Sequence, residues 1–223
     1  MTTLVLIHSA GGNEHSYDAL LPFLRGIDVR VPALPGRSGV ETEHPGTIGC
    51  AAEWVRGWLE ENAIERAVVG GHSMGGAVAL ELGLSAAPAV AAIALISTGA
   101  RLRVHPEILQ TLASATRGGE APDLSKWLLP DPARERTAPR AAELDWKMAD
   151  GFDRLDSVAN VRVPALVVSG ADDRLTPPRY AAFLHEHLPR ATRVTIPGAG
   201  HDLPIQRPRE LAEALLEFVA TAR

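Results

Sequence analysis

Hydrophobic residues along this 223-residue chain alternate between short continuous apolar runs and longer stretches with helical spacing. Continuous runs are typical of buried strands in a parallel sheet, whereas apolar residues three or four positions apart indicate amphipathic helices. We therefore predict an α/β fold with a mostly parallel sheet of about six strands and helices on both faces. The expected strands are Leu4–His8, Val29–Pro32, Ala67–Gly70, Ala92–Ser97, Ala165–Gly170 and Arg193–Pro197, and the expected helices are Ser16–Arg25, Thr47–Glu61, Met74–Ala87, Pro177–Leu188 and Arg207–Thr221.

One segment, about 99–163, departs from this alternation. It is too long for a single crossover and is scattered with Pro, Gly, Arg and Asp, although apolar clusters around Ile108 and Trp127 could each anchor a short helix. Since a chain of this length is too short for two domains of ordinary size, we expect one domain over 1–223. We interpret the segment as a short helical lid inserted into that domain.

The composition is that of a globular protein, with 46% hydrophobic and 22% charged residues. Lys and Arg number 22 against 27 Asp and Glu, a formal net charge of −5, and no basic run could neutralise several phosphates. We therefore expect no nucleic-acid partner. No apolar stretch is long enough to span a bilayer, so no membrane partner is expected either.

The single cysteine, Cys50, cannot form an intramolecular disulfide. It lies in a predicted helix, where we expect it to act as a small buried hydrophobic residue. The N-terminus has neither a basic region nor a small-residue cleavage site ahead of its first apolar run. Together these features favour a cytoplasmic location.

The strongest local motif is Gly71-His72-Ser73-Met74-Gly75, which lies between a predicted strand and a predicted helix. This Gly-x-Ser-x-Gly spacing in a strand–turn–helix context is typical of a nucleophile elbow. A turn so sharp strains the backbone of the serine, and glycine two residues to either side avoids collisions with neighbouring backbone. The turn would expose the Ser73 hydroxyl at the carboxyl end of the sheet.

Two nucleotide-binding interpretations of the glycines are excluded. The spacing from Gly70 to Gly75 fits a phosphate loop, but Gly76 follows where a lysine would have to meet the phosphates. A dinucleotide loop after the first strand would need Gly-x-Gly-x-x-Gly, whereas the chain has His8-Ser9-Ala10-Gly11-Gly12. No cofactor is expected.

A serine nucleophile needs a histidine base that is oriented by a carboxylate. Of the eight histidines, His201 follows a flexible loop after the last strand, so it could reach back over the strand ends. His185 and His187 are interpreted as surface residues and His44 and His105 as polar loop or lid residues, whereas His72 is expected to turn away from the site. Two acids, Asp172 and Asp173, follow the fifth strand, and either could orient the base.

The order Ser73, Asp172 or Asp173, His201 resembles the α/β-hydrolase superfamily, in its short-lidded carboxylesterase branch, over nearly the whole chain. The family's Gly-x-x-Asp frame falls on Gly170 and Asp173, so the resemblance selects Asp173. It further implies that the backbone N–H groups of Ala10 and Met74 form the oxyanion hole, although Ser9 replaces the usual glycine of that loop. It also implies that the family's first two strands are missing here.

The resemblance implies a serine hydrolase that cleaves small carboxylic esters through an acyl-enzyme, with no cofactor and no metal. The segments His8–Gly12 and Leu34–Arg37 also resemble thioesterases that edit peptide and polyketide synthases. An acyl thioesterase or a lactonase therefore stays open, as does a carbon–carbon bond hydrolase with the same triad. A non-catalytic ligand-binding scaffold is a further alternative, which the intact triad disfavours.

Overall fold

The six strands form one parallel sheet in a computed structural model, which describes residues 2–37 and 43–222. The strands are β1 (Thr3–Ile7), β2 (Asp28–Arg30), β3 (Ala67–His72), β4 (Val90–Ile96), β5 (Ala165–Gly170) and β6 (Ala191–Ile196). Their order across the sheet is β2-β1-β3-β4-β5-β6. Parallel neighbours require crossover connections, which are mostly helices here. The predicted α/β fold and its parallel sheet are confirmed.

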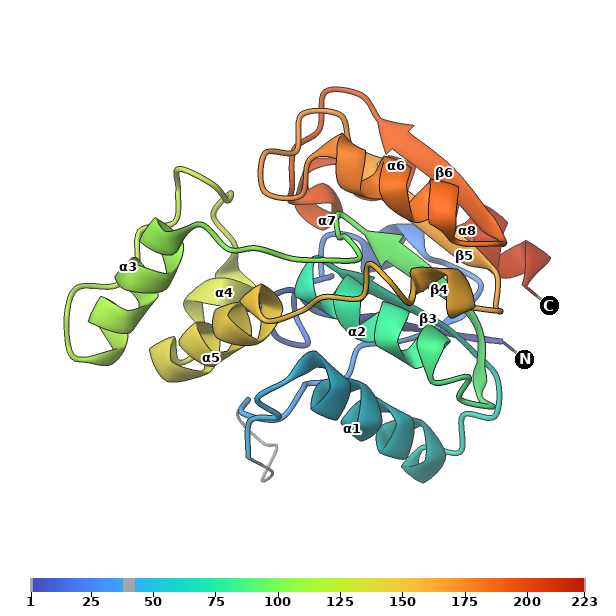
Figure 1. The fold of residues 1–223 in the computed structure, drawn as a ribbon, viewed down its shortest axis with the longest axis horizontal. Coiled ribbons are helices and arrows are strands. Elements are labelled where there is room, and N and C mark those ends of the chain that lie inside the picture. Colours follow the sequence, from blue (N-terminus) through green and yellow to red (C-terminus); the bar gives the residue numbers. More distant parts are fainter. Residues whose placement is uncertain (1, 38–42, 223) are drawn as a thin grey trace.

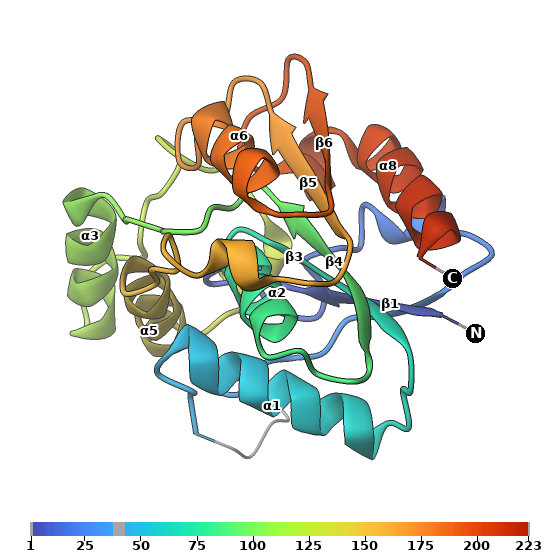
Figure 2. The ribbon, with the colours of Figure 1, turned by 45° about the vertical axis from the view of Figure 1, so that its right-hand side comes forward.

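Helices cover both faces of the sheet (Figures 1 and 2). Those on one face are α1 (Ile48–Glu61), α2 (Met74–Leu84) and α6 (Pro178–His187), and those on the other are the 3-10 helix η1 (Leu21–Phe23) and α8 (Pro208–Thr221). The side chains of β1 alternate between the two resulting cores, since Val5 and Ile7 face one and Leu4 and Leu6 face the other. The inner strands β1, β3, β4 and β5 are therefore buried on both sides of the sheet, which explains their largely apolar sequences.

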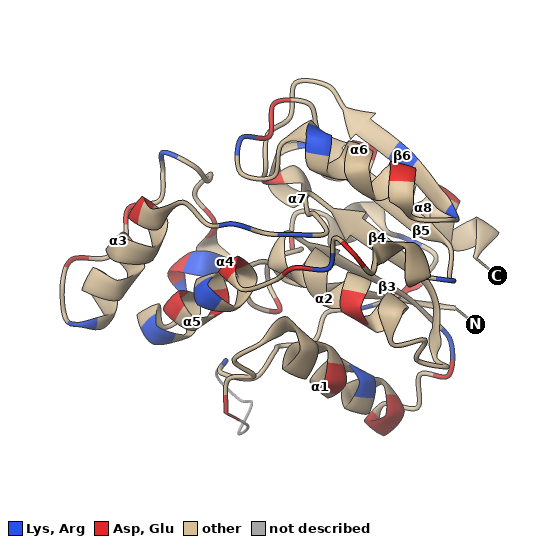
Figure 3. Ribbon diagram, viewed as in Figure 1, with Lys and Arg blue, Asp and Glu red and all other residues tan. Residues whose placement is uncertain are grey.

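The segment 99–163 contains three α-helices and one 3-10 helix. These are α3 (Pro106–Thr116), α4 (Pro132–Glu135), α5 (Pro139–Asp150) and η2 (Val158–Asn160). Helices α3, α4 and α5 lie together on the side of the molecule away from both termini (Figure 1), and acidic and basic residues are interspersed along α4 and α5 (Figure 3). Their buried side, which includes Ile108, Leu112 and Trp146, is part of the same core as α1 and α2.

Two expectations about local structure are wrong. The segment Ser16–Arg25 is a series of turns ending in η1, because Pro22 has no N–H and its ring disfavours a continuous α-helix. Tyr17, Leu20 and Leu24 are nevertheless buried. The helical spacing of these residues therefore identifies correctly which side chains are buried, although the segment is not an α-helix. Cys50 lies in α1 as expected, but it is exposed because the helix turns that side toward solvent.

Candidate active site

Ser73 occupies a strained turn between β3 and α2. Its backbone has φ 55° and ψ −115°, in a region that L residues rarely adopt, and its N–H donates to Ile96 O at 2.8 Å. A Cβ added to Gly71 would lie 2.2 Å from Gly75 O, and one added to Gly75 would lie 2.1 Å from Ile7 O. Both glycines are therefore required by close backbone approach, as expected for a turn that holds its central residue in one conformation.

His201 and Asp173 form a buried pair. Nδ1 of His201 lies 2.9 Å from Oδ2 and 3.2 Å from Oδ1 of Asp173. The carboxylate also accepts hydrogen bonds from the backbone N–H groups of Leu175 and Thr176, both at 2.9 Å, and from Thr176 Oγ1 at 2.8 Å. Burial alone would raise the pKa of the Asp173 carboxyl, but the facing His201 and these hydrogen bonds hold it below its ordinary value. Asp173 is thus ionised and its Oδ2 faces the imidazole.

Ser73, His201 and Ala10 line one small cavity, of about 30 Å³, together with Trp146 from α5 and Thr176. Because Nδ1 of His201 is turned to Asp173, its Nε2 is the ring nitrogen left for the serine. Neither the Ala10 nor the Met74 amide donates a hydrogen bond to another group in residues 2–37 and 43–222. Met74 is the first residue of α2, where the helix dipole adds positive potential.

The two adjacent acids have different environments. Asp173 is 4% exposed, whereas the Asp172 side chain is exposed and the backbone N–H of Asp172 donates to Ala199 O. His72, which we expected to turn away, instead has its ring centroid 4.9 Å from that of His201. Nε2 of His72 donates to the backbone carbonyl of His201 at 2.9 Å, so His72 holds the loop that carries the base.

Sequence reasoning missed the side chains that connect the segment 99–163 to this site. Asp202, next to His201, is buried and accepts from the Leu129 N–H at 2.7 Å and from Arg134 at 3.0 Å. Burial raises the pKa of Asp202, but the Arg134 and His201 charges outweigh it and the pKa lies below its ordinary value. Only its position beside His201 could have drawn attention to it, because its partners lie about seventy residues away in the chain.

Neither a metal site nor a membrane-spanning helix is found within the described residues. No group of three or more His, Cys, Asp or Glu side chains there is arranged to hold a metal ion. None of the helices in those same residues has the length and apolar character needed to cross a membrane.

A parallel α/β sheet with a serine on a strained strand–helix turn, beside a histidine–aspartate pair, defines a protein of the hydrolase class. Comparison with known proteins agrees, because residues 4–214 match the model of the alpha/beta hydrolase family. The chain belongs to the alpha/beta hydrolase family, as the resemblance predicted, and it is a hydrolase.

Individual relatives cover almost the whole chain. A pimeloyl-[acyl-carrier protein] methyl ester esterase of Neisseria meningitidis is 29% identical over 240 residues, which are 96% of this chain and 92% of that protein. Among solved structures, a thermophilic esterase is 31% identical with a TM-score of 0.83, covering 98% of this chain and 90% of that one. The enol-lactonase of Burkholderia xenovorans LB400 has a TM-score of 0.86 at 23% identity, covers 98% of this chain and 91% of that one, and shares the fold.

Proposed function

We propose that this hydrolase cleaves small carboxylic esters, with Ser73 as nucleophile, His201 as general base and acid, and Asp173 as the group that orients the imidazole. The observation that carries the proposal is the buried Asp173–His201 pair, whose His201 lines the same cavity as the strained Ser73. The esterase names of the relatives support ester substrates.

The reaction proceeds through an acyl-enzyme. Ser73 Oγ attacks the ester carbonyl while Nε2 of His201 accepts the hydroxyl proton, and Asp173 stabilises the imidazolium that forms. The N–H groups of Ala10 and Met74 hydrogen-bond to the negative oxygen of the tetrahedral intermediate. His201 then protonates the departing alkoxide, and water, activated by the same imidazole, releases the acid and restores Ser73.

A larger cavity beside the site supports an acyl group with substantial apolar surface. It has a volume of about 450 Å³, within the usual range for small-molecule pockets, and Trp146 lines both this cavity and the one that contains Ser73. The lining includes Leu112, Leu128 and Ala142 from the segment 99–163. In this proposal the segment is a lid that shapes the substrate pocket of a single domain.

The proposal extends to the setting in which the enzyme works. Its partner is a small ester or thioester, without nucleic acid or membrane, as the net charge of −5 supports. A cytoplasmic location is proposed because Cys50 is the single cysteine.

A panel of substrates tests the proposal. Purified protein is assayed with p-nitrophenyl esters of graded acyl length beside acyl-CoA thioesters and simple lactones. We expect the esters to be turned over, with kcat/KM depending on acyl length, and activity to be absent in Ser73→Ala. Hydrolysis restricted to thioesters or lactones would reassign the substrate class, and ester turnover by Ser73→Ala would contradict the assigned nucleophile.

A further inference from the structure

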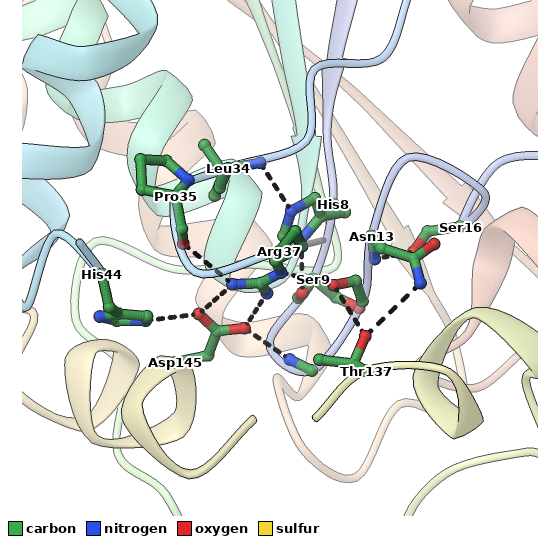
Figure 4. A network of polar contacts seen from close by, with 12 residues as sticks. His8, Ser9, Asn13, Ser16, Leu34, Pro35, Arg37, His44, Thr137 and Asp145 are labelled. Carbon is green, nitrogen blue, oxygen red and sulfur yellow. Dashed lines mark hydrogen bonds and ion pairs between the residues drawn. The ribbon is translucent and has the colours of Figure 1, made fainter. Parts of the chain in front are cut away.

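A buried ion cluster connects the segment 99–163 to the loop that follows β1 (Figure 4). Asp145, on α5, is fully buried and is held by Arg37, whose Nη1 donates to Oδ1 at 3.1 Å and whose Nη2 donates to Oδ2. The same carboxylate accepts from His44 Nε2 at 2.9 Å and from the Gly11 N–H at 2.8 Å. Four nitrogen donors, from Gly11, Arg37 and His44, therefore meet on one carboxylate.

The hydrogen bonds of the cluster define its charges. The Gly46 N–H donates to Nδ1 of His44 at 3.1 Å, so the proton of the neutral ring is on Nε2, which donates to Asp145. Burial alone would raise the pKa of Asp145, but the His44 hydrogen bond and the Arg37 charge hold it below its ordinary value. Asp145 is therefore an anion compensated by the Arg37 cation.

The Arg37–Asp145 ion pair holds the loop of residues 8–13, which carries Ala10, through two hydrogen bonds to one turn. Asp145 accepts from the Gly11 N–H, while Nε of Arg37 donates to Gly12 O at 3.0 Å. Gly11 has φ 72°, a conformation that is easy only for glycine. The turn is therefore held by Arg37 and Asp145, which also form an ion pair with each other.

The direction of the Ala10 amide depends on this turn. The Ser9 carbonyl and the Ala10 N–H belong to one trans peptide, so they point in opposite directions. Ser9 O accepts from Gly12 N at 2.9 Å and from His8 Nδ1 at 3.0 Å, which directs the Ala10 N–H the other way. The next peptide is fixed by the bond from the Gly11 N–H to Asp145. Both peptides that flank the Ala10 Cα are thus held.

From this geometry we infer that Asp145 is a positioning residue that aims the Ala10 N–H at the oxyanion. The inference rests on the proposed function, in which that N–H stabilises the tetrahedral intermediate. Such a bond is stronger in the transition state than in the ground state, so its misalignment lowers kcat more than it raises KM. Asp145 itself touches no reacting atom and acts through Gly11.

The test compares carboxylates on the same helix. Asp145→Asn removes the charge but leaves Arg37 unpaired, so the double variant Asp145→Asn with Arg37→Gln is made as well. The matched control is Glu143→Gln, because Glu143 is also buried on α5 and pairs with Arg140 and Lys147 rather than with the loop of residues 8–13. The readouts are kcat, KM, the melting temperature and the Kd of a trifluoromethyl ketone that forms an anionic adduct with Ser73.

We expect kcat of the Asp145 variants to fall about 10- to 100-fold, with KM within about twofold and the ketone Kd raised by a matching factor. Glu143→Gln should stay within about twofold of wild type. If the melting temperature falls but kcat per folded molecule and the ketone Kd are unchanged, Asp145 is only a structural anchor and the inference is overturned.

A substrate-independent measurement separates this inference from the proposed function. Amide hydrogen exchange of the wild type should show strong protection of the Gly11 N–H, which donates to Asp145, and the Asp145 variants should lose that protection. Fast exchange of Gly11 in the wild type, or unchanged exchange in the variants, would overturn the positioning role. If the wild type hydrolysed no ester while the exchange results held, only the proposed function would fail.

Discussion

Replacement of Asp173 by Asn should abolish most activity while leaving the fold intact. The side chain is isosteric, and its retained Oδ1 still accepts from the N–H groups of Leu175 and Thr176. The amide that replaces Oδ2, however, would place N–H groups where Nδ1 of His201 lies 2.9 Å away. The imidazole would then have to accept at Nδ1 and carry its proton on Nε2, so it could not take the proton of Ser73.

By analogy with the same change in serine proteases, this tautomer reversal should lower kcat by about 10⁴-fold. The adjacent Asp172→Asn is the matched control, because the Asp172 side chain is exposed, and it should cost less than about tenfold. The assay is kcat on an activated ester, with circular dichroism to verify folding. The reverse ranking, an inactive Asp172→Asn and an active Asp173→Asn, would refute the assignment of the acid.

Two further predictions concern two buried histidines and the tight turn. Burial, with a smaller effect of Arg37, lowers the pKa of His8 to about 4, and burial, with a smaller effect of His201, lowers that of His72 to about 3. Both rings are neutral in the folded state, so the stability they contribute is complete above about pH 6.5, and each contribution falls by about 1.4 kcal/mol per pH unit on acidification. Urea unfolding at several pH values measures this loss. A free energy of unfolding that does not change between pH 6.5 and pH 5 would disprove the prediction. Gly75→Ala should prevent folding, because its Cβ would lie 2.1 Å from Ile7 O. Gly57→Ala is the control: this residue lies in α1, its Cβ would have no neighbour within 4 Å, and the change should raise the free energy of unfolding by roughly 0.5–1 kcal/mol. Soluble yield and thermal melts distinguish the two variants, and a well-folded Gly75→Ala would disprove the steric argument.

The fold was predictable because its signals are local. The four inner strands, β1, β3, β4 and β5, are largely apolar runs, and the glycines around Ser73 indicate a close backbone approach that no other residue permits. The segment Ser16–Arg25 misled because Tyr17, Leu20 and Leu24 recur at helical spacing, although Pro22 prevents an α-helix.

The polar partners of the site were not predictable, because they come together only through the fold. Asp145 lies 108 positions from Arg37, and no periodicity or motif connects the two. The sequence around His44 indicates only a polar loop residue, because the burial of its side chain against Asp145 depends on where α5 packs. Buried charges leave a weak sequence signal, because their identity is fixed by one distant partner rather than by a repeated pattern.

The central claim, that Ser73 is the nucleophile of this hydrolase, is tested most directly by covalent labelling. Wild-type protein and Ser73→Ala are treated with a fluorophosphonate, digested, and the modified residue is located by mass spectrometry. We expect a single adduct on Ser73 in the wild type, loss of ester turnover in proportion to labelling, and no adduct in Ser73→Ala. An adduct on another residue, or an unlabelled wild type that still hydrolyses esters, would contradict the claim.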